Sequence, residues 1–203
     1  MKRIISAVLC AALLCVCLFG CSKDKTDAKA DWSSGKHHVV IDVKDYGKMT
    51  VELDADSAPI TVENFMTLAS DGFYDGLTFH RIISGFMIQG GDPQGNGMGG
   101  SEKTIKGEFS SNGVNNPIKH VRGTISMARA SDPDSASSQF FIVHQTSDGN
   151  SYSLDGNYAA FGQVTEGMEV VDKICDALGG MGDSNGMIAS RYQPVITSIK
   201  IVD

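Results

Sequence analysis

FHRIISGFMIQGGD, residues 79 to 92, is the segment of this 203-residue chain that decides its fold. Its β-branched and aromatic residues predict strand structure from Phe79 to Gln89, ahead of a glycine pair. A single arginine, Arg81, stands inside the apolar run. Taken by itself, a lone arginine is usually a surface residue in a salt bridge.

Short strands continue on both sides of this segment. Apolar and polar residues alternate from Val39 to Val43 and from Met49 to Leu53, with a turn at 45–47 between them. Apolar residues at helical spacing predict two helices, from Pro59 to Gly72 and from Glu166 to Ala177. Further strands are predicted at 123–128, 139–143, 159–164 and 197–201. With 23 glycines in the chain, the pattern favours one mainly β domain, a barrel or a sandwich.

Three segments, taken together, resemble the cyclophilin family. The first is residues 79–92, the second is GTISMARA at 123–130 leading to SQFFI at 138–142, and the third is LDG at 154–156 followed by FGQV at 161–164. Their order and spacing also match, and the resemblance covers residues 37–203. It implies a closed eight-stranded antiparallel barrel with two capping helices. It also implies a peptidyl-prolyl cis-trans isomerase, or rotamase, with an active groove on the outside of the barrel wall.

The reaction that this family catalyses makes modest chemical demands. The X-Pro amide has a rotation barrier of roughly 18–20 kcal/mol, because resonance gives the C–N bond double-bond character. A site that prefers the twisted amide over both planar forms lowers this barrier. It needs a hydrogen-bond donor near the proline nitrogen and an apolar slot for the ring. We therefore expect no cofactor and no metal.

The resemblance assigns roles to eleven residues of this sequence. Those expected to be catalytic are Arg81, Phe86, Gln89 and Phe141, with Arg81 as the donor. Those expected to bind substrate are His80, Met87, Ala128, Arg129, Gln139, Leu154 and Tyr158. His80 has no proton to abstract in this reaction, so we interpret it as a structural partner rather than a base. Because neighbours on a strand face opposite ways, Phe140 should enter the core while Phe141 faces the groove.

Three positions depart from the pattern of many eukaryotic family members. Ser153 stands where those members carry a tryptophan, Tyr158 where a histidine is frequent, and Arg129 where an asparagine is common. The tryptophan is tied to tight cyclosporin binding in the family, so we expect weak inhibition. The replacement at Arg129 leaves the preference for the substrate sequence open.

The N-terminus resembles a bacterial lipoprotein signal peptide. Lys2 and Arg3 precede an apolar run from Ile4 to about Leu18, and Cys21 follows. We expect cleavage after residue 20 and lipidation of Cys21, then a flexible polar tether to residue 36 and the isomerase domain at 37–203. An ordinary signal peptide or an uncleaved anchor would be the alternatives. This prediction places the domain at the cell membrane, lipid-anchored on the extracytoplasmic face.

Composition limits the other classes of function. The formal net charge is −7 and no basic run occurs, so we expect no nucleic-acid partner. Outside the signal segment and Cys21, Cys175 is the remaining cysteine, which we expect to be buried. GNGMGG at 95–100 lacks the surrounding βαβ unit of a dinucleotide site and is predicted to be a flexible loop near the groove. His37 and His38 lack further ligands at metal-binding spacing.

Two alternatives to the enzyme stay open at this level. The domain could capture proline-containing segments as a binding module or holdase with little turnover, or it could scaffold a membrane complex. Arg81 favours the enzyme, because a pure binder has no need for the donor. The expected partners are proline-containing segments of unfolded or partly folded exported proteins. We expect the protein to be a monomer.

Overall fold

The computed structural model describes residues 30–145 and 154–203, and one compact body extends from Asp31 to Asp203. The predicted signal peptide, the predicted lipidation site Cys21 and much of the predicted tether lie outside the described residues. Ser153 lies outside them as well.

The first two strands form the hairpin that the alternating pattern predicts. β1 (Lys36–Val43) and β2 (Gly47–Asp54) pair antiparallel, from Lys36 opposite Asp54 to Val43 opposite Gly47. Val39, Ile41 and Val43 on β1 are buried, as are the alternate residues of β2. Period-two burial is expected when one face of a strand covers a core.

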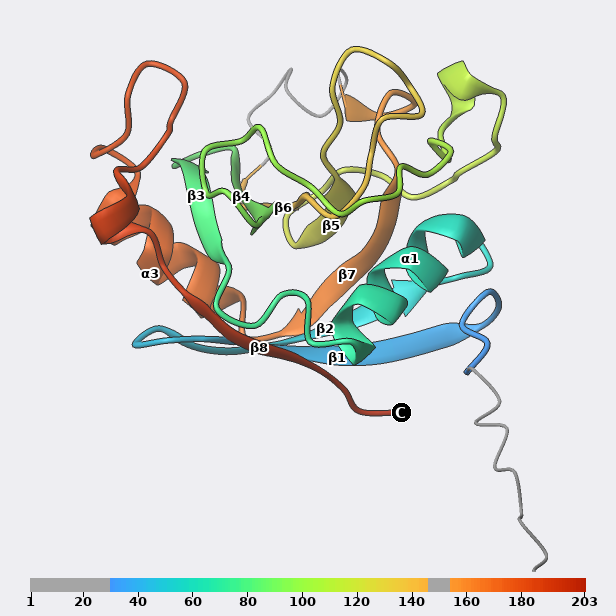
Figure 1. The fold of residues 1–203 in the computed structure, drawn as a ribbon, viewed down its shortest axis with the longest axis horizontal. Coiled ribbons are helices and arrows are strands. Elements are labelled where there is room, and N and C mark those ends of the chain that lie inside the picture. Colours follow the sequence, from blue (N-terminus) through green and yellow to red (C-terminus); the bar gives the residue numbers. More distant parts are fainter. Residues whose placement is uncertain (1–29, 146–153) are drawn as a thin grey trace, which may run out of the picture. The chain divides into compact units, whose positions relative to one another are not determined.

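Eight strands make one antiparallel sheet in the order β3-β4-β6-β5-β7-β2-β1-β8. The remaining strands are β3 (Thr78–Ile83), β4 (Met87–Asp92), β5 (Thr124–Met127), β6 (Phe140–Val143), β7 (Ala160–Glu166) and β8 (Ile196–Ile201). The predicted strand structure at 79–89 is a hairpin, in which β3 and β4 flank a turn at Gly85, where φ is +83°. Figure 1 shows the sheet curling so that its strands surround a common interior.

In the described part of the chain, the helices α1 (Pro59–Ser70) and α3 (Met168–Leu178) pack against the curled sheet (Figure 1). α1 begins with proline, and two of its first amide groups, at Ile60 and Thr61, donate to the distant carboxylate of Glu108. α3 begins two residues later than predicted. Gly167 explains the shift, because its φ of +84° is not helical. Short 3₁₀ turns lie at Ser110–Asn112 and Ser190–Tyr192.

The prediction of a closed barrel is wrong. The edge strands β3 and β8 share no ladder, so the eight strands form an open half-barrel. Two isolated bridges, Thr78 to Val195 and Arg81 to Met187, join β3 to the segment that precedes β8. The irregular segment before β8 lies along β3 instead: the Ile82 amide donates to Gly186 O at 2.8 Å, and the Phe79 amide donates to Pro194 O at 2.9 Å. Pro194 has no amide hydrogen to offer a ladder. The edge of β3 is therefore covered without closing the sheet.

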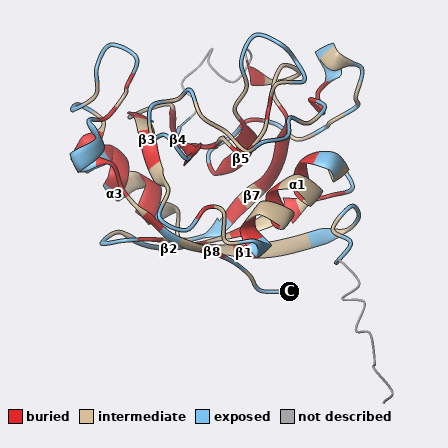
Figure 2. Ribbon diagram, viewed as in Figure 1, coloured by how far each residue is buried: buried red, intermediate tan, exposed pale blue. Residues whose placement is uncertain are grey.

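The two faces of the sheet carry clusters of different size. Inside, Phe65 of α1 packs against Phe140 with ring centroids 5.4 Å apart and against Phe161 at 5.2 Å. Figure 2 shows buried residues along the strands and helices and exposed ones in the loops. A smaller cluster of Met87, Phe141, Val143 and Leu154 is separate from this core. The prediction that Phe140 and Phe141 separate is confirmed.

Candidate active site

Strand register places three of the predicted residues in one row. Arg81 on β3 pairs with Gln89 on β4, and Gln89 pairs with Phe141 on β6. Directly opposed residues of antiparallel strands project from the same face of a sheet. The polar and aromatic side chains of the row therefore lie side by side on the face away from the main core.

Arg81 is held by its neighbours while keeping part of its guanidinium available. Nη1 donates to Gln89 Oε1 at 3.3 Å, and Nε donates to the carbonyl of Asn185 at 2.7 Å. Nη2 makes no hydrogen bond to any described residue. Burial lowers the pKa of Arg81, while Tyr158 and Asp183 act in the opposite direction. A guanidinium stays protonated in proteins, so this side chain is a positively charged donor.

A pocket of about 370 Å³, lined by aliphatic and aromatic side chains together with polar ones, opens beside this guanidinium. Nine of the eleven predicted residues line it: Arg81, Phe86, Met87, Gln89, Ala128, Arg129, Phe141, Leu154 and Tyr158. Met87, Phe141 and Leu154 are almost fully buried and pack against one another. Such a pocket can hold a small apolar ring beside a charged donor.

A second cavity of about 350 Å³ adjoins the first and shares Gln89, Ala128 and Arg129 with it. Gln139, the tenth predicted residue, lies here. Its Oε1 accepts from Gln89 Nε2 at 2.8 Å, and its Nε2 donates to the carbonyl of Gly99 at 2.7 Å. A chain of hydrogen bonds therefore runs from Arg81 through both glutamines to the loop that lines the second cavity.

The glycine-rich loop at 95–100 lies at the groove, as predicted, but it is tied to the domain. The Asp92 carboxylate accepts hydrogen bonds from the amides of Gln94 at 2.8 Å and Asn96 at 3.0 Å, and from that of Gly97. Burial raises the pKa of Asp92, but the backbone hydrogen bonds outweigh it and lower the pKa overall. The loop is thus organised around an ionised carboxylate, which corrects the prediction of flexibility.

His80 does not reach either cavity. Its side chain is completely buried, and neither ring nitrogen has a hydrogen-bond partner among the described residues. Burial lowers the pKa of His80, with Asp92 opposing this effect. The prediction of a substrate contact is therefore corrected. His80 follows the same alternation that separates Phe140 from Phe141, since its neighbour Arg81 faces the pocket.

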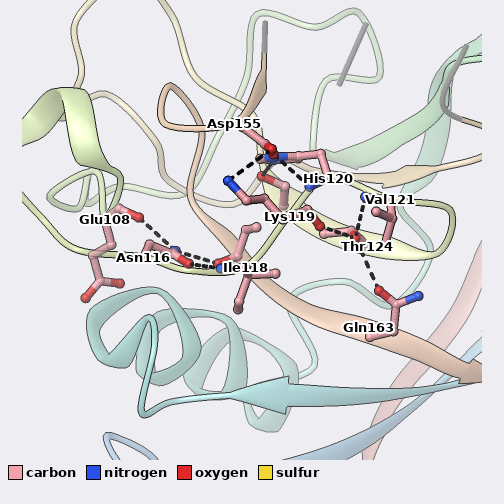
Figure 3. Close-up of polar contacts among 11 residues, drawn as sticks. Glu108, Asn116, Ile118, Lys119, His120, Val121, Thr124, Asp155 and Gln163 are labelled. Atoms are coloured by element: carbon pink, nitrogen blue, oxygen red, sulfur yellow. Dashed lines mark hydrogen bonds and ion pairs between the residues drawn. The ribbon is translucent and has the colours of Figure 1, made fainter. Parts of the chain in front are cut away.

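Sequence reasoning missed a support behind Phe141. The His120 ring stacks on Phe141 with centroids 5.9 Å apart and planes 16° apart. Asp155 accepts from the His120 amide at 2.8 Å and contacts Nδ1 at 2.9 Å, as Figure 3 shows. Asp155 follows Leu154, so this contact fixes one wall of the pocket. Burial lowers the pKa of His120, which Asp155 only partly offsets.

Asp155, His120 and Ser126 form a hydrogen-bonded series, because His120 Nε2 contacts Ser126 Oγ at 2.9 Å. The order acid, imidazole, hydroxyl also occurs in serine hydrolases. Here Ser126 is 0% exposed and His120 is 1% exposed. A substrate carbonyl cannot reach the hydroxyl, so this series supports the pocket and is no hydrolase site.

The described ranges are 30–145 and 154–203. No group of three or more His, Cys, Asp or Glu residues there is placed to hold a metal ion. Within the same ranges, no helix has the length and apolar character needed to cross a membrane. Cys175 is buried, and burial raises the pKa of its thiol to about 12.

Residues 38–201 match a family model described as "Cyclophilin type peptidyl-prolyl cis-trans isomerase/CLD". A peptidyl-prolyl cis-trans isomerase of Helicobacter pylori is 48% identical over 130 residues, which covers 63% of this chain and 75% of that protein. Peptidyl-prolyl cis-trans isomerase B of Bacillus subtilis is 48% identical over 127 residues, covering 63% of this chain and 82% of that protein.

Solved structures agree with this match. The crystal structure of a cyclophilin-type isomerase from Cryptosporidium parvum superposes with a TM-score of 0.69 at 30% identity, covering 83% of this chain and 99% of that one. A second structure of the same protein, determined in the presence of the dipeptide Ala-Pro, gives a TM-score of 0.67 at 31% identity.

Proposed function

This chain belongs to the cyclophilin-type peptidyl-prolyl cis-trans isomerase family, and we propose that it isomerises X-Pro bonds of exported proteins from a lipid-anchored position at the membrane. The isomerase activity follows from the family and from the named relatives. The residues that perform it, the clients and the anchor are parts of the proposal.

The proposed mechanism is non-covalent. In the planar amide the nitrogen lone pair is delocalised, and uncatalysed isomerisation takes tens to hundreds of seconds. Twisting the C–N bond returns the lone pair to nitrogen, which then accepts a hydrogen bond. A donor that meets the nitrogen only in the twisted form stabilises the transition state more than either ground state.

The observation that carries this mechanism is the position of the Arg81 guanidinium in the lining of the pocket, beside aliphatic and aromatic side chains. Gln89 Oε1 and the Asn185 carbonyl orient two of its nitrogens, so the remaining N–H groups have a fixed direction. The proline ring would lie against Met87, Phe141 and Leu154. A similar protein from C. parvum was studied with Ala-Pro, which supports a proline-containing ligand here.

The pocket also supplies desolvation. The twisted amide is less polar than its resonance form, so an apolar wall favours it over the planar amide. A charge-assisted hydrogen bond contributes about 1.5–3 kcal/mol, which is roughly ten- to a hundredfold in rate. Binding and positioning of the peptide by Gln89, Gln139 and the second cavity must therefore supply the remainder.

A proline-binding module with little turnover is the competing function. The ordered contacts of Arg81 favour the enzyme, because a binder gains nothing from a cation held at the pocket rim and partly desolvated.

The proposed location rests on the N-terminal sequence. Lys2 and Arg3, the apolar run from Ile4 and the cysteine at position 21 have the order of a lipoprotein signal. A polar segment separates Cys21 from β1, which begins at Lys36. Such a segment would allow the isomerase domain to bind polypeptides that emerge on the extracytoplasmic face of the cell membrane. A single lipid chain binds a membrane only marginally, so the proposal includes more than one acyl chain on Cys21.

The test of this location is expression of the full chain in a bacterium fed labelled palmitate. We expect label in the wild-type chain, isomerase activity in the membrane fraction, and loss of both label and membrane association in Cys21→Ser. Cys17→Ser is the matched control and should behave as wild type. Unlabelled wild-type protein whose activity is wholly in the soluble fraction would refute the anchor while leaving the isomerase intact.

A further inference from the structure

Arg129 lies where the two cavities of the groove meet. It follows β5 and Ala128. It lines both the second cavity and the pocket beside Arg81 that is proposed to hold the proline ring, the proline pocket. Those cavities share only Gln89, Ala128 and Arg129. A peptide that occupies both must therefore pass this side chain, and Arg129 carries the one charge among the three shared residues.

The guanidinium of Arg129 is fixed without the help of a substrate. Nε donates to the Asn157 carbonyl at 3.0 Å, and Nη1 donates to the carbonyls of Ala130 at 2.9 Å and Ser131 at 3.3 Å. Its Cζ lies 4.8 Å from the centroid of the Tyr158 ring and 5.2 Å from that of Phe109. Much of the rotamer entropy of a free arginine is therefore lost before any ligand binds.

Among the described residues, these partners leave the positive charge of Arg129 without a counter-ion. Every hydrogen-bond acceptor of Arg129 is a neutral carbonyl, and within the described part of the chain no carboxylate oxygen lies within 4.0 Å of it. Arg122, by contrast, pairs with Asp172 at 2.7 Å. Two acidic residues of the adjacent loop contact other groups: Asp134 accepts from Gly107 and Asn112, and Asp132 accepts from the Asp134 amide.

We propose that Arg129 makes the enzyme select X-Pro bonds that have an aspartate or glutamate close to the proline. This inference rests on the proposed isomerase function and adds the class of substrate. Arg129 Nη2 makes no hydrogen bond to a described residue and can donate to a peptide carboxylate. Because the protein carries a net charge of −7, Arg129 discriminates by contact rather than by long-range attraction.

The alternative role for Arg129 is purely structural. Its bonds to Asn157, Ala130 and Ser131 also clamp two loops together. A clamp would affect all substrates equally, so the ratio between a charged and a neutral substrate separates the two roles.

The test uses the purified full-length protein and pairs of short X-Pro peptides that differ only by Glu or Gln, placed in turn at the three positions before and the two after proline. For at least one position we expect kcat/KM for the Glu peptide to exceed that for the Gln peptide by about two- to fivefold, the range of a partly exposed ion pair. The ratio should fall toward one in Arg129→Asn, stay above one in Arg129→Lys, and decline in wild type as salt is raised.

The outcomes separate the two hypotheses. A wild-type ratio of one at every position, or an unchanged ratio in Arg129→Asn, overturns the proposed preference. No acceleration of the Gln peptides by wild type would instead overturn the isomerase assignment. If Arg129→Asn fails to fold, the salt dependence of the wild-type ratio decides alone, since only an ionic contact is screened.

Discussion

At the scale of single residues, the site depends on how Arg81 is oriented. Gln89 Oε1 accepts a hydrogen bond from Nη1 of Arg81 at 3.3 Å, and Gln89 Nε2 donates one to Gln139 Oε1 at 2.8 Å. It therefore links the proposed donor to the second cavity, and its removal should disturb both orientation and peptide alignment.

Gln89→Ala should lower kcat/KM by about tenfold, since one hydrogen bond to a charged group contributes about 1.5–3 kcal/mol and part of it orients the donor. Steady-state kinetics on an X-Pro peptide would measure this. Gln163→Ala is a matched control, because Gln163 bonds Thr124 and the Arg122 carbonyl away from the groove. Equal losses in the two variants would contradict the role of Gln89.

The strand pattern predicts which face of the sheet a side chain lies on only where residues alternate along a strand. It separates Phe140 from Phe141 correctly, and the same rule applied to His80 beside Arg81 would have placed the histidine inside. The contact of His120 with Asp155 joins residues 35 positions apart and depends on how two loops meet. No local pattern marks such a pair.

At the scale of elements, the β3–β4 turn is fastened to α3 by a buried histidine. The Gly85 amide donates to His144 Nδ1 at 3.0 Å, so the ring proton is on Nε2, which faces Asp172 Oδ1 at 3.2 Å. Arg122 donates to Asp172 at 2.7 Å and to the His144 carbonyl at 2.8 Å. The turn held in this way carries Phe86, which lines the proline pocket.

His144→Ala should destabilise the protein by about 1–3 kcal/mol, because it leaves the Gly85 amide without its acceptor and removes one of the two contacts of the Asp172 carboxylate, which keeps Arg122. It should also raise KM more than it lowers kcat, because Phe86 belongs to the binding wall. Thermal unfolding and peptide kinetics measure these effects. Lys173→Ala, on the exposed face of α3, is the control. A His144→Ala protein with wild-type KM would show that the β3–β4 turn keeps its conformation without His144.

The positions of strands and helices could be predicted from the sequence better than whether the sheet closes into a barrel. Period-two and helical spacings are local, so the strands and both helices appear close to their predicted positions. Closure of the barrel depends on whether β3 pairs with β8, which are separated by most of the chain. The Gly- and Pro-containing segment that occupies the β3 edge decides this through long-range hydrogen bonds.

At the scale of the whole molecule, two buried histidines link stability to pH. Burial lowers the pKa of both His80 and His120 below the ordinary value of 6.5. The unfolded chain therefore binds more protons than the folded one once the pH falls below about 7. The stability that these two neutral histidines contribute is fully present above the pKa of the unfolded chain. It is lost as the pH falls toward the lower pKa values of the folded protein.

Urea unfolding between pH 8 and 5 should show a constant free energy of unfolding down to about pH 7 and a decline below it. His80→Leu removes one of the two titrating groups from the core and should make this decline shallower. A free energy that is flat or rises toward pH 5 would contradict the burial of neutral histidines in the fold.

The most direct test of the central claim is the rate of cis-to-trans conversion of an X-Pro peptide with wild type, Arg81→Ala and Arg81→Lys, after thermal unfolding has shown that all three are folded. We predict rapid conversion by wild type, a loss of roughly ten- to a hundredfold in Arg81→Ala, and partial recovery in Arg81→Lys, which keeps the charge but not the fork of donors. Wild-type rates in a folded Arg81→Ala protein would contradict the account of the donor, and no acceleration by any of the three would leave a proline-binding module.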